Sequence, residues 1–143
     1  QMIPGATAMQ TAAYVGLKTR GVRGAAASYV GLGLPAFLLM AVIFGFSSIP
    51  SKEMPSFGWL DFSVKKFGHA FGYGLLAVAY LRGLDGKRPW LAWLMAIAYS
   101  ATDEFHQSFV PGRHPSPMDV LLFDNLGALF GLWFYSFFTK RKK

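Results

Sequence analysis

The sequence predicts an all-α integral membrane protein, folded as a four-helix bundle with both termini in the cytoplasm. Hydrophobic residues make up 53% of the chain and charged residues only 15%, a balance that is unusual for a soluble domain. Four apolar runs follow one another, each close to the about 20 residues that cross a bilayer. The basic residues gather in alternate connections between these runs, as the positive-inside rule describes.

Residues 1–24 are polar-to-small and poorly patterned, and we interpret them as an N-terminal arm before a transmembrane domain of residues 25–143. The first span is expected over residues 25–49, with a kink at Pro35. Basic residues precede this run, as they precede a signal peptide: Lys18, Arg20 and Arg23. Because the run is long and no Ala-x-Ala-like cleavage site follows it, we interpret it as a retained anchor.

Three further spans are expected over residues 67–84, 89–109 and 117–139. The second is short and rich in Gly and Ala, and the third opens with Pro89, which suits a first helical position. The fourth is the most hydrophobic of the four and ends in a basic tail.

Ten of the 14 Lys and Arg residues lie before the first span, between the second and third spans, and in the C-terminal tail. We therefore place these three segments in the cytoplasm. We attribute the net charge of +7 to topology and to contact with anionic membrane lipids. Nucleic acid is not an expected partner, because the short connections lack a basic surface with stacking aromatic residues.

This topology places most ionisable side chains on the extracytoplasmic half. Six of the seven carboxylates and all three histidines lie there: Glu53, Asp61, Asp103, Glu104, Asp119, Asp124, His69, His106 and His114. Acidic residues contribute little to topology, so their clustering needs another explanation. Residues at the start of the second span, the end of the third and the start of the fourth reach one membrane face at similar depth. This arrangement predicts a polar site.

Helix periodicity orders the polar residues of the third span. One stripe carries four of them, at i, i+3, i+6 and i+7: Ser100, Asp103, His106 and Gln107. Asp103 and Gln107 form an i, i+4 pair, whereas Glu104 turns about 100° away from Asp103.

The fourth span carries a carboxylate that hydrocarbon disfavours. Asp124 lies about 10 Å past Pro117, at about 1.5 Å per residue. An unpaired carboxylate at the bilayer centre costs about 2.5–3.5 kcal/mol on insertion scales, so we expect Asp124 to face the bundle. Gly127 and Gly131 lie on the same face and form a G-x-x-x-G step. Because small residues also flank His69, we expect the second and fourth spans to pack closely.

Several motifs run in one order through roughly Lys65 to Trp133. They are Lys66-x-x-His69-x-x-x-Tyr73, Asp103-Glu104-x-x-Gln107, Phe109-x-Pro111-Gly112-Arg113, Asp119, and Asp124-x-x-Gly127-Ala128-x-x-x-Gly131. This order resembles the VanZ-like family. The resemblance implies a small, multi-span protein of the bacterial cytoplasmic membrane, related to a founding member linked to low-level teicoplanin resistance. It implies no settled activity. Lys65 stands where members often carry Asp, which leaves the partner of Lys66 open.

Two functions remain open from the sequence. In the first, a site on the extracytoplasmic face acts on or binds a cell-envelope lipid or glycan species. If this site is catalytic, carboxylates and an imidazole supply its acid and base groups: Asp103, Glu104 and His69. The remaining polar residues would contact the substrate: Lys66, Tyr73, Gln107, Arg113, Asp119 and Asp124. Among these, Arg113 offers a bidentate fork for phosphate or carboxylate.

The alternative is a non-catalytic accessory subunit, which docks on a larger membrane protein complex and stabilises it through its G-x-x-x-G faces and aromatic spans. Membrane lipids are expected partners in both cases. Each of these residues could instead have a purely structural role, such as a bond between helices from Asp124 to His69 or Arg113. If the site held a metal ion, its ligands would be His69, Asp103, His106 and Asp124. None of the familiar dense ligand spacings occurs, so we predict no metal and no cofactor.

Overall fold

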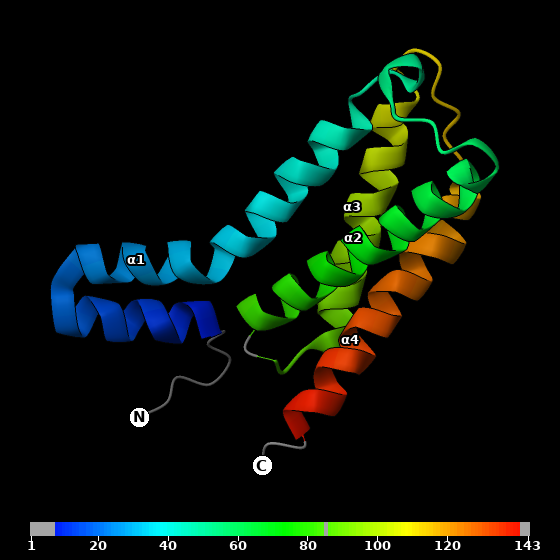
Figure 1. The fold of residues 1–143 in the computed structure, drawn as a ribbon. Helices are drawn as coiled ribbons and strands as arrows, with labels where there is room; N and C mark the ends of the chain where they lie inside the picture. The colour runs from blue at the N-terminus through cyan, green and yellow to red at the C-terminus, as the bar shows by residue number, and fades with distance from the viewer. Residues whose placement is uncertain (1–7, 85, 141–143) are drawn as a thin grey trace.

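The computed structural model describes residues 8–84 and 86–140, and it contains helices and connections but no strand within those ranges. The long helices are α1 (Ala8–Ser47), α2 (Asp61–Gly83), α3 (Pro89–Gln107) and α4 (Asn125–Lys140). A π-helix, η3 (Asp119–Asp124), runs directly into α4, and two short 3₁₀ turns, η1 (Ser51–Glu53) and η2 (Gly58–Leu60), precede α2. The all-α class predicted from the sequence is confirmed (Figure 1).

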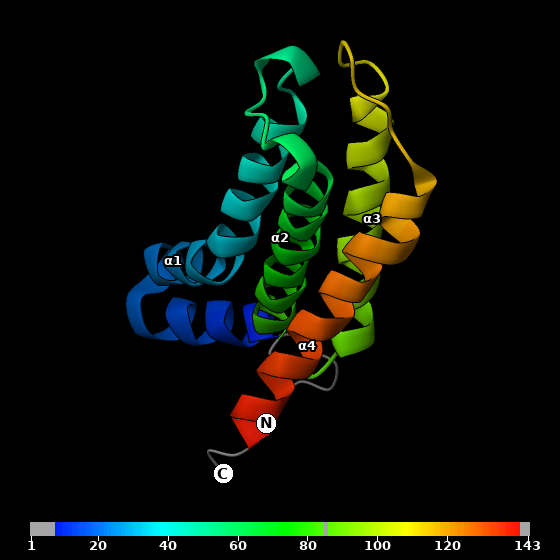
Figure 2. The ribbon, with the colours of Figure 1, turned by 45° about the vertical axis from the view of Figure 1, so that its right-hand side comes forward.

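Helices α2, α3 and α4 run alternately down, up and down beside the second half of α1 (Figures 1 and 2). The connections after α1 and after α3 therefore lie at one end of the bundle, and the connection between α2 and α3 lies at the other. This arrangement brings the ends of α1 and α3 next to the starts of α2 and η3, as the sequence predicted for the polar residues.

The first helix differs from the prediction. It begins at Ala8 rather than near residue 25, so the predicted arm is helical over residues 8–24, and residues 1–7 lie outside the described chain. The ribbon of α1 turns back on itself in its darker blue half and changes direction again where blue passes to cyan (Figure 1). Gly21, with φ of 65°, interrupts the regular geometry of the first half. Pro35 lies inside the helix, where a kink is expected.

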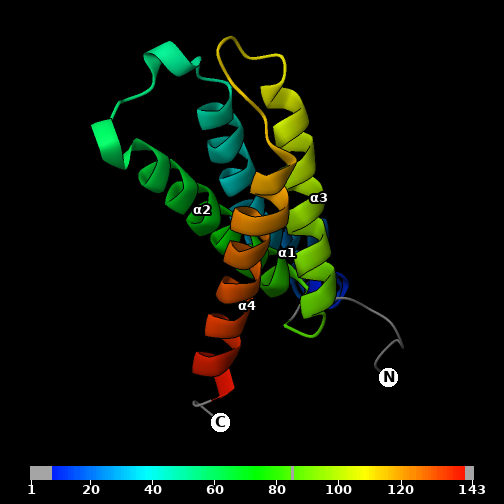
Figure 3. The same cartoon turned by 90° about the vertical axis from the view of Figure 1, so that its right-hand side faces the viewer.

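The bundle is held together by a close crossing of α2 and α4, which Figure 3 shows. The glycines of the two helices touch: a Cβ on Gly74 would lie 2.8 Å from the carbonyl oxygen of Gly127, and one on Gly131 would lie 2.5 Å from that of Gly74. The predicted close packing of these two segments is therefore confirmed. Small and aliphatic residues complete the core around Tyr73: Leu76, Ala77, Leu81, Ala92, Ala96, Ala128 and Leu132.

Within the described residues, one helix is long and apolar enough to cross a membrane by length and composition, Asp119–Thr139, while Gly33–Ser47 is apolar but shorter. Large apolar side chains also point outward from all four helices. Examples are Phe37, Phe71, Leu94 and Phe130, which are 66%, 58%, 47% and 63% exposed.

Candidate functional site

Buried and half-buried polar side chains gather at the end of the bundle where α1 and α3 finish and α2 and η3 begin. We call this set the polar cluster: Ser47, Lys66, His69, Tyr73, Ser100, Asp103, Glu104, Gln107, Asp119 and Asp124. Its members come from every long helical segment except the regular part of α4. Four of them are buried carboxylates, so the cluster concentrates negative charge inside a largely apolar bundle.

Asp103 joins three helices. Its Oδ2 accepts hydrogen bonds from Ser47 Oγ at 2.7 Å, Tyr73 OH at 3.1 Å and Gln107 Nε2 at 3.0 Å. The i, i+4 pairing of Asp103 with Gln107 is thus confirmed. The second oxygen, Oδ1, is buried and has no hydrogen-bond partner among the described residues.

Asp124 joins η3 to the two helices beside it. Its Oδ2 accepts a hydrogen bond of 2.5 Å from Ser100 Oγ, on the same stripe of α3 as Asp103. Its Oδ1 lies 3.3 Å from His69 Nδ1, at ion-pair distance but without hydrogen-bond alignment. Neither Asp124 Oδ1 nor His69 Nδ1 has a hydrogen-bond partner within the described part of the chain. We call Oδ1 of Asp103 and Oδ1 of Asp124 the open oxygens.

The π-helix explains how two carboxylates of η3 reach the same neighbour. Lys66 and His69 lie three residues apart on α2, and they meet Asp119 and Asp124, respectively. In an α-helix of about 3.6 residues per turn, Asp119 and Asp124 would point about 140° apart. The wider i→i+5 turn brings residue i+5 nearly above residue i. The π geometry therefore turns both carboxylates toward α2.

Adjacent lysines on α2 have different partners. Lys66 Nζ contacts both carboxylate oxygens of Asp119 and lies 5.4 Å from the ring centroids of Phe62 and Phe123. Lys65 instead forms an ion pair of 2.6 Å with Asp61, one turn earlier, and this hydrogen bond lowers the pKa of the Asp61 carboxyl. Asp119 is thus the partner of Lys66 that the sequence left open.

Glu104 lies on a different side of α3 from Asp103, as expected, yet it is also buried. Its Oε2 accepts a hydrogen bond of 2.8 Å from the backbone N–H of Ser116, which fixes the connection before η3. Its charge lies within electrostatic range of His69, Asp119 and Asp124. Glu104 therefore adds a fourth buried carboxyl group to the cluster and shares none of the donors of Asp103.

The polar cluster reaches the surface through α2. The side chains of Lys66 and His69 are 20% and 23% exposed, whereas that of Asp124 is 1% exposed. Asp103 and Tyr73 are 3% and 1% exposed. A ligand that enters from outside would meet Lys66 and His69 before it reaches the open oxygens.

Arg113 lies in the connection after α3 and turns toward α1. Its Nε donates to the carbonyl oxygen of Ile49 at 3.2 Å, and its Nη2 donates to that of Phe46 at 2.7 Å. These carbonyls lie at the end of α1, where the last residues of a helix leave acceptors unsatisfied. The structure gives Arg113 a capping role, and its contact with an anionic substrate stays a prediction.

Replacing Arg113 with alanine is expected to destabilise the protein by about 1–2 kcal/mol, because two hydrogen bonds from a charged donor are lost. Arg113→Lys keeps the charge but loses the two-pronged geometry, so an intermediate loss is expected. Free energies of unfolding in detergent micelles would measure both. An Arg113→Ala protein as stable as the parent would contradict the capping role.

His106 also turns to α1 and not to a carboxylate. Its ring stacks on Phe44 with centroids 4.4 Å apart, and its Nε2 lies 3.1 Å from Ser48 Oγ. Within the described residues, no three His, Asp or Glu side chains are grouped so that they could hold a metal ion. The ligand set that combined His69, Asp103, His106 and Asp124 therefore has no such grouping in this fold.

The sequence reasoning missed Ser47, whose hydroxyl is buried against Asp103. Ser47 and Ser48 close the apolar part of α1 at the same end as the other polar residues. That position is the signal that would have added them to the site.

The model of the VanZ/LLP1 family matches residues 32–139. An uncharacterized transporter of Methanocaldococcus jannaschii is 58% identical over 40 residues, which are 28% of this chain and 10% of that protein. This chain therefore spans about a tenth of the length of that relative. No solved structure matches. Because the family match includes the whole polar cluster and most of the sequence, the chain belongs to the VanZ/LLP1 family.

Proposed function

We propose that this chain is a multi-span protein of the bacterial cytoplasmic membrane, with the polar cluster on its extracytoplasmic side. The cluster binds a hydroxyl or ammonium group of a cell-envelope lipid or glycan species. The observation that carries this proposal is the pair of open oxygens: Oδ1 of Asp103 has no hydrogen-bond partner among the described residues, and Oδ1 of Asp124 is met by the His69 ring at 3.3 Å. Buried acceptors without a donor are rare in folded proteins, and a ligand's N–H or O–H groups would satisfy them.

The charge of the polar cluster favours a donor over an anion. Four carboxylates are buried in it, and the nearby cations are already engaged. Lys66 is held by Asp119, and Arg113 is held by the end of α1. A phosphate or carboxylate would meet repulsion from Asp103 and Asp124, whereas an ammonium group or a hydroxyl would find acceptors.

The membrane setting rests on three supports. Large apolar side chains face outward on every long helix, which would be unfavourable in water. The segment Asp119–Thr139 is long enough to span, and basic residues follow it. The transporter-named relative from Methanocaldococcus jannaschii agrees with a membrane protein. The distribution of Lys and Arg supports a topology with both termini inside and the polar cluster outside.

Binding is proposed in preference to turnover. Asp103 is held by three protein donors, and His69 Nδ1 is not aligned for a hydrogen bond with Asp124. A general base needs to lie within hydrogen-bond reach of the proton that it removes. Catalytic roles for Asp103, Glu104 and His69 would require a ligand that reorganises these contacts.

The accessory-subunit alternative loses part of its support. Its docking surface included the G-x-x-x-G faces, but Gly74, Gly127 and Gly131 contact each other within the chain. The exposed aromatic side chains of α4, such as Phe130 and Trp133, remain available to a partner and equally to lipid. Extraction in mild detergent would test this alternative, which requires a stoichiometric protein that co-migrates with the chain.

Lipids with identical chains and different head groups would test the proposed function. Phosphatidylethanolamine carries N–H donors and phosphatidylglycerol carries O–H donors, whereas phosphatidylcholine carries neither. Native mass spectrometry of the purified protein is expected to show either donor lipid bound about tenfold more tightly than phosphatidylcholine, as one or two charge-assisted hydrogen bonds would give. Asp124→Asn and Asp103→Asn should each abolish this preference.

Asp61→Asn is the matched control, because it removes a carboxylate from a partly exposed ion pair outside the polar cluster. It should leave the head-group preference unchanged. Equal binding of all three lipids, or an unchanged preference in both cluster variants, would refute the proposal.

A further inference from the structure

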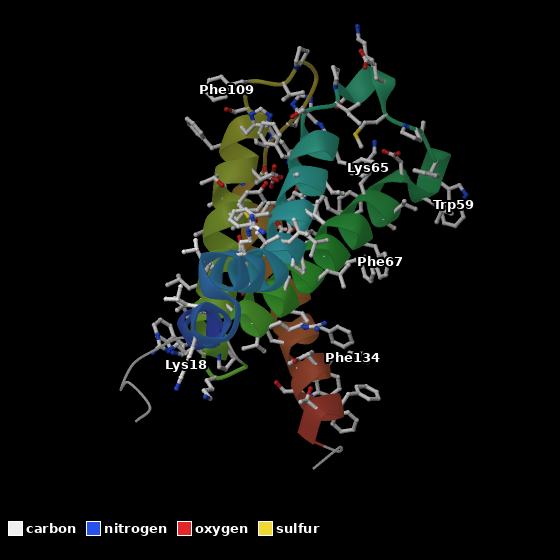
Figure 4. The ribbon with its side chains drawn as sticks, turned by 90° about the vertical axis from the view of Figure 1, so that its left-hand side faces the viewer. Lys18, Trp59, Lys65, Phe67, Phe109 and Phe134 are labelled. Carbon is white, nitrogen blue, oxygen red and sulfur yellow. The ribbon has the colours of Figure 1, made fainter. Side chains whose placement is uncertain are left out.

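An apolar groove runs along the outer side of the α2–α4 crossing. It has a volume of about 810 Å³ and is lined by residues from Phe67 to Val78 on α2 and from Leu126 to Thr139 on α4. Gly74, Gly127 and Gly131 contribute to its floor, where the two backbones touch. Phe67 and Phe134 project from α2 and α4 on the same side of the molecule (Figure 4).

Along α2, the groove begins within one helical turn of the exposed members of the polar cluster. Its first residue, Phe67, follows Lys66, and Ala70, also in the lining, follows His69. Lys66 and His69 are the cluster members through which a ligand would enter. A molecule with a polar group at His69 would therefore find the first groove residues less than one helical turn away along α2.

The dimensions of the groove suit a hydrocarbon chain. Its extent along α4, from Leu126 to Thr139, is about 20 Å at about 1.5 Å per residue. That length exceeds one leaflet of a hydrocarbon core about 30 Å thick. The volume of about 810 Å³ lies within the range of known ligand pockets, roughly 300–1,000 Å³.

We infer that this groove holds the hydrocarbon chain of the same lipid whose hydroxyl or ammonium group binds the polar cluster. This inference rests on the proposed function and narrows its ligand from a lipid or glycan to a lipid-linked molecule. The polar cluster selects the head group, and the groove supplies apolar contact area along the chain. A soluble glycan would contact the polar cluster but not the groove.

A chain fits this groove better than a helix of another protein does. Close helix–helix approach in membranes uses small residues, and the glycines of the floor are already in contact with one another. A docked apolar helix would also leave the open oxygens without donors. A lipid satisfies both parts of the surface at once.

Photolabelling with tail-modified lipids would test the inference. The probes are phosphatidylethanolamine and phosphatidylcholine with a diazirine near the end of one chain, in vesicles that contain the full protein. We expect the ethanolamine probe to label peptides of α4 that line the groove. Leu75→Trp places a bulkier side chain in the middle of the groove, and should cut the labelling severalfold because chain contacts along α2 are lost.

Leu129→Trp is the matched control, since Leu129 is exposed on α4 but does not line the groove. The ethanolamine probe should label this variant to the same extent as the parent. Val78→Trp provides a second groove-filling variant if Leu75→Trp does not fold.

Different failures are distinguishable. If the head-group preference persists but labelling lies outside the groove or survives both groove-filling variants, the inference is wrong and the proposed function stands. If the groove is labelled equally by both probes and Asp124→Asn has no effect, the link between groove and cluster is wrong, and the proposed function fails with it.

Discussion

Alanine at Gly127 is expected to force α2 and α4 apart. A Cβ at this position would overlap the backbone of Ala70, including its carbonyl oxygen, carbonyl carbon and Cα. Backbone atoms of a helix cannot rotate away as a side chain can, so relief requires separation of the whole crossing. Overpacking of this kind typically costs about 1–3 kcal/mol, and the upper end is expected here because the obstacle is backbone.

Gly68 offers a control on the same pair of helices. A Cβ on Gly68 would meet no atom of the described residues within 4 Å. Gly68→Ala should therefore stabilise the helix by about 0.5–1 kcal/mol, because alanine loses less conformational entropy on folding. Reversible unfolding of both variants in mixed micelles should show changes of opposite sign in the free energy of unfolding, relative to the parent. A Gly127→Ala protein no less stable than the parent would show that the crossing is looser than described.

The second large effect is expected at Lys66, where substitution by methionine should strongly destabilise the protein. The change leaves the buried carboxylate of Asp119 without its cation, and removing one partner of a buried pair costs about 3–5 kcal/mol. We expect the lower end, about 3 kcal/mol, because a fifth of the Lys66 side chain is exposed. Lys65→Met is the neighbouring control, and it should change stability by no more than about 1 kcal/mol, because both side chains of its pair with Asp61 are about one-third exposed.

A double variant separates the lost pair from a packing defect. Replacing both partners, Lys66→Met with Asp119→Leu, should restore most of the stability, because no buried charge is then left alone. The same unfolding measurement applies. If the double variant is as unstable as Lys66→Met, the loss comes from packing against Phe62 and Phe123 and the ion pair is not its cause.

Helices α2, α3 and α4 were predictable because long apolar runs bounded by Pro and basic residues leave few alternatives. The meeting of His69, Asp103 and Asp124 at one end of the bundle followed from the alternating direction of these helices. The helical character of residues 8–24 was not predictable, because their small residues show no clear periodicity. The sidedness of the termini stays a prediction.

Individual partners in the site were harder to predict than its location. Arg113 was expected to face an anion, but a loop residue's direction depends on tertiary contacts, and here the carbonyls of α1 lie within reach. Ser47 was missed because a serine at the end of an apolar run has no periodic signal of its own. Asp119 was expected at the start of the fourth span. Its contact with Lys66 depends on the π-helix η3, which a periodicity of 3.6 residues does not describe.

That turn makes the site sensitive to chain length as well as to residue type. A π-helix contains one residue more than an α-helix that joins the same two ends. Deleting one of residues 120–123 would restore a regular helix with the two aspartates at i, i+4, about 40° apart, so both carboxylates would still face α2. Adding one residue instead would place them six residues apart, about 120° from one another on a regular helix, and would separate the Lys66 pair from the His69 pair with every polar side chain retained. A one-residue insertion between Asp119 and Asp124 is therefore expected to change the site as much as a substitution of either aspartate.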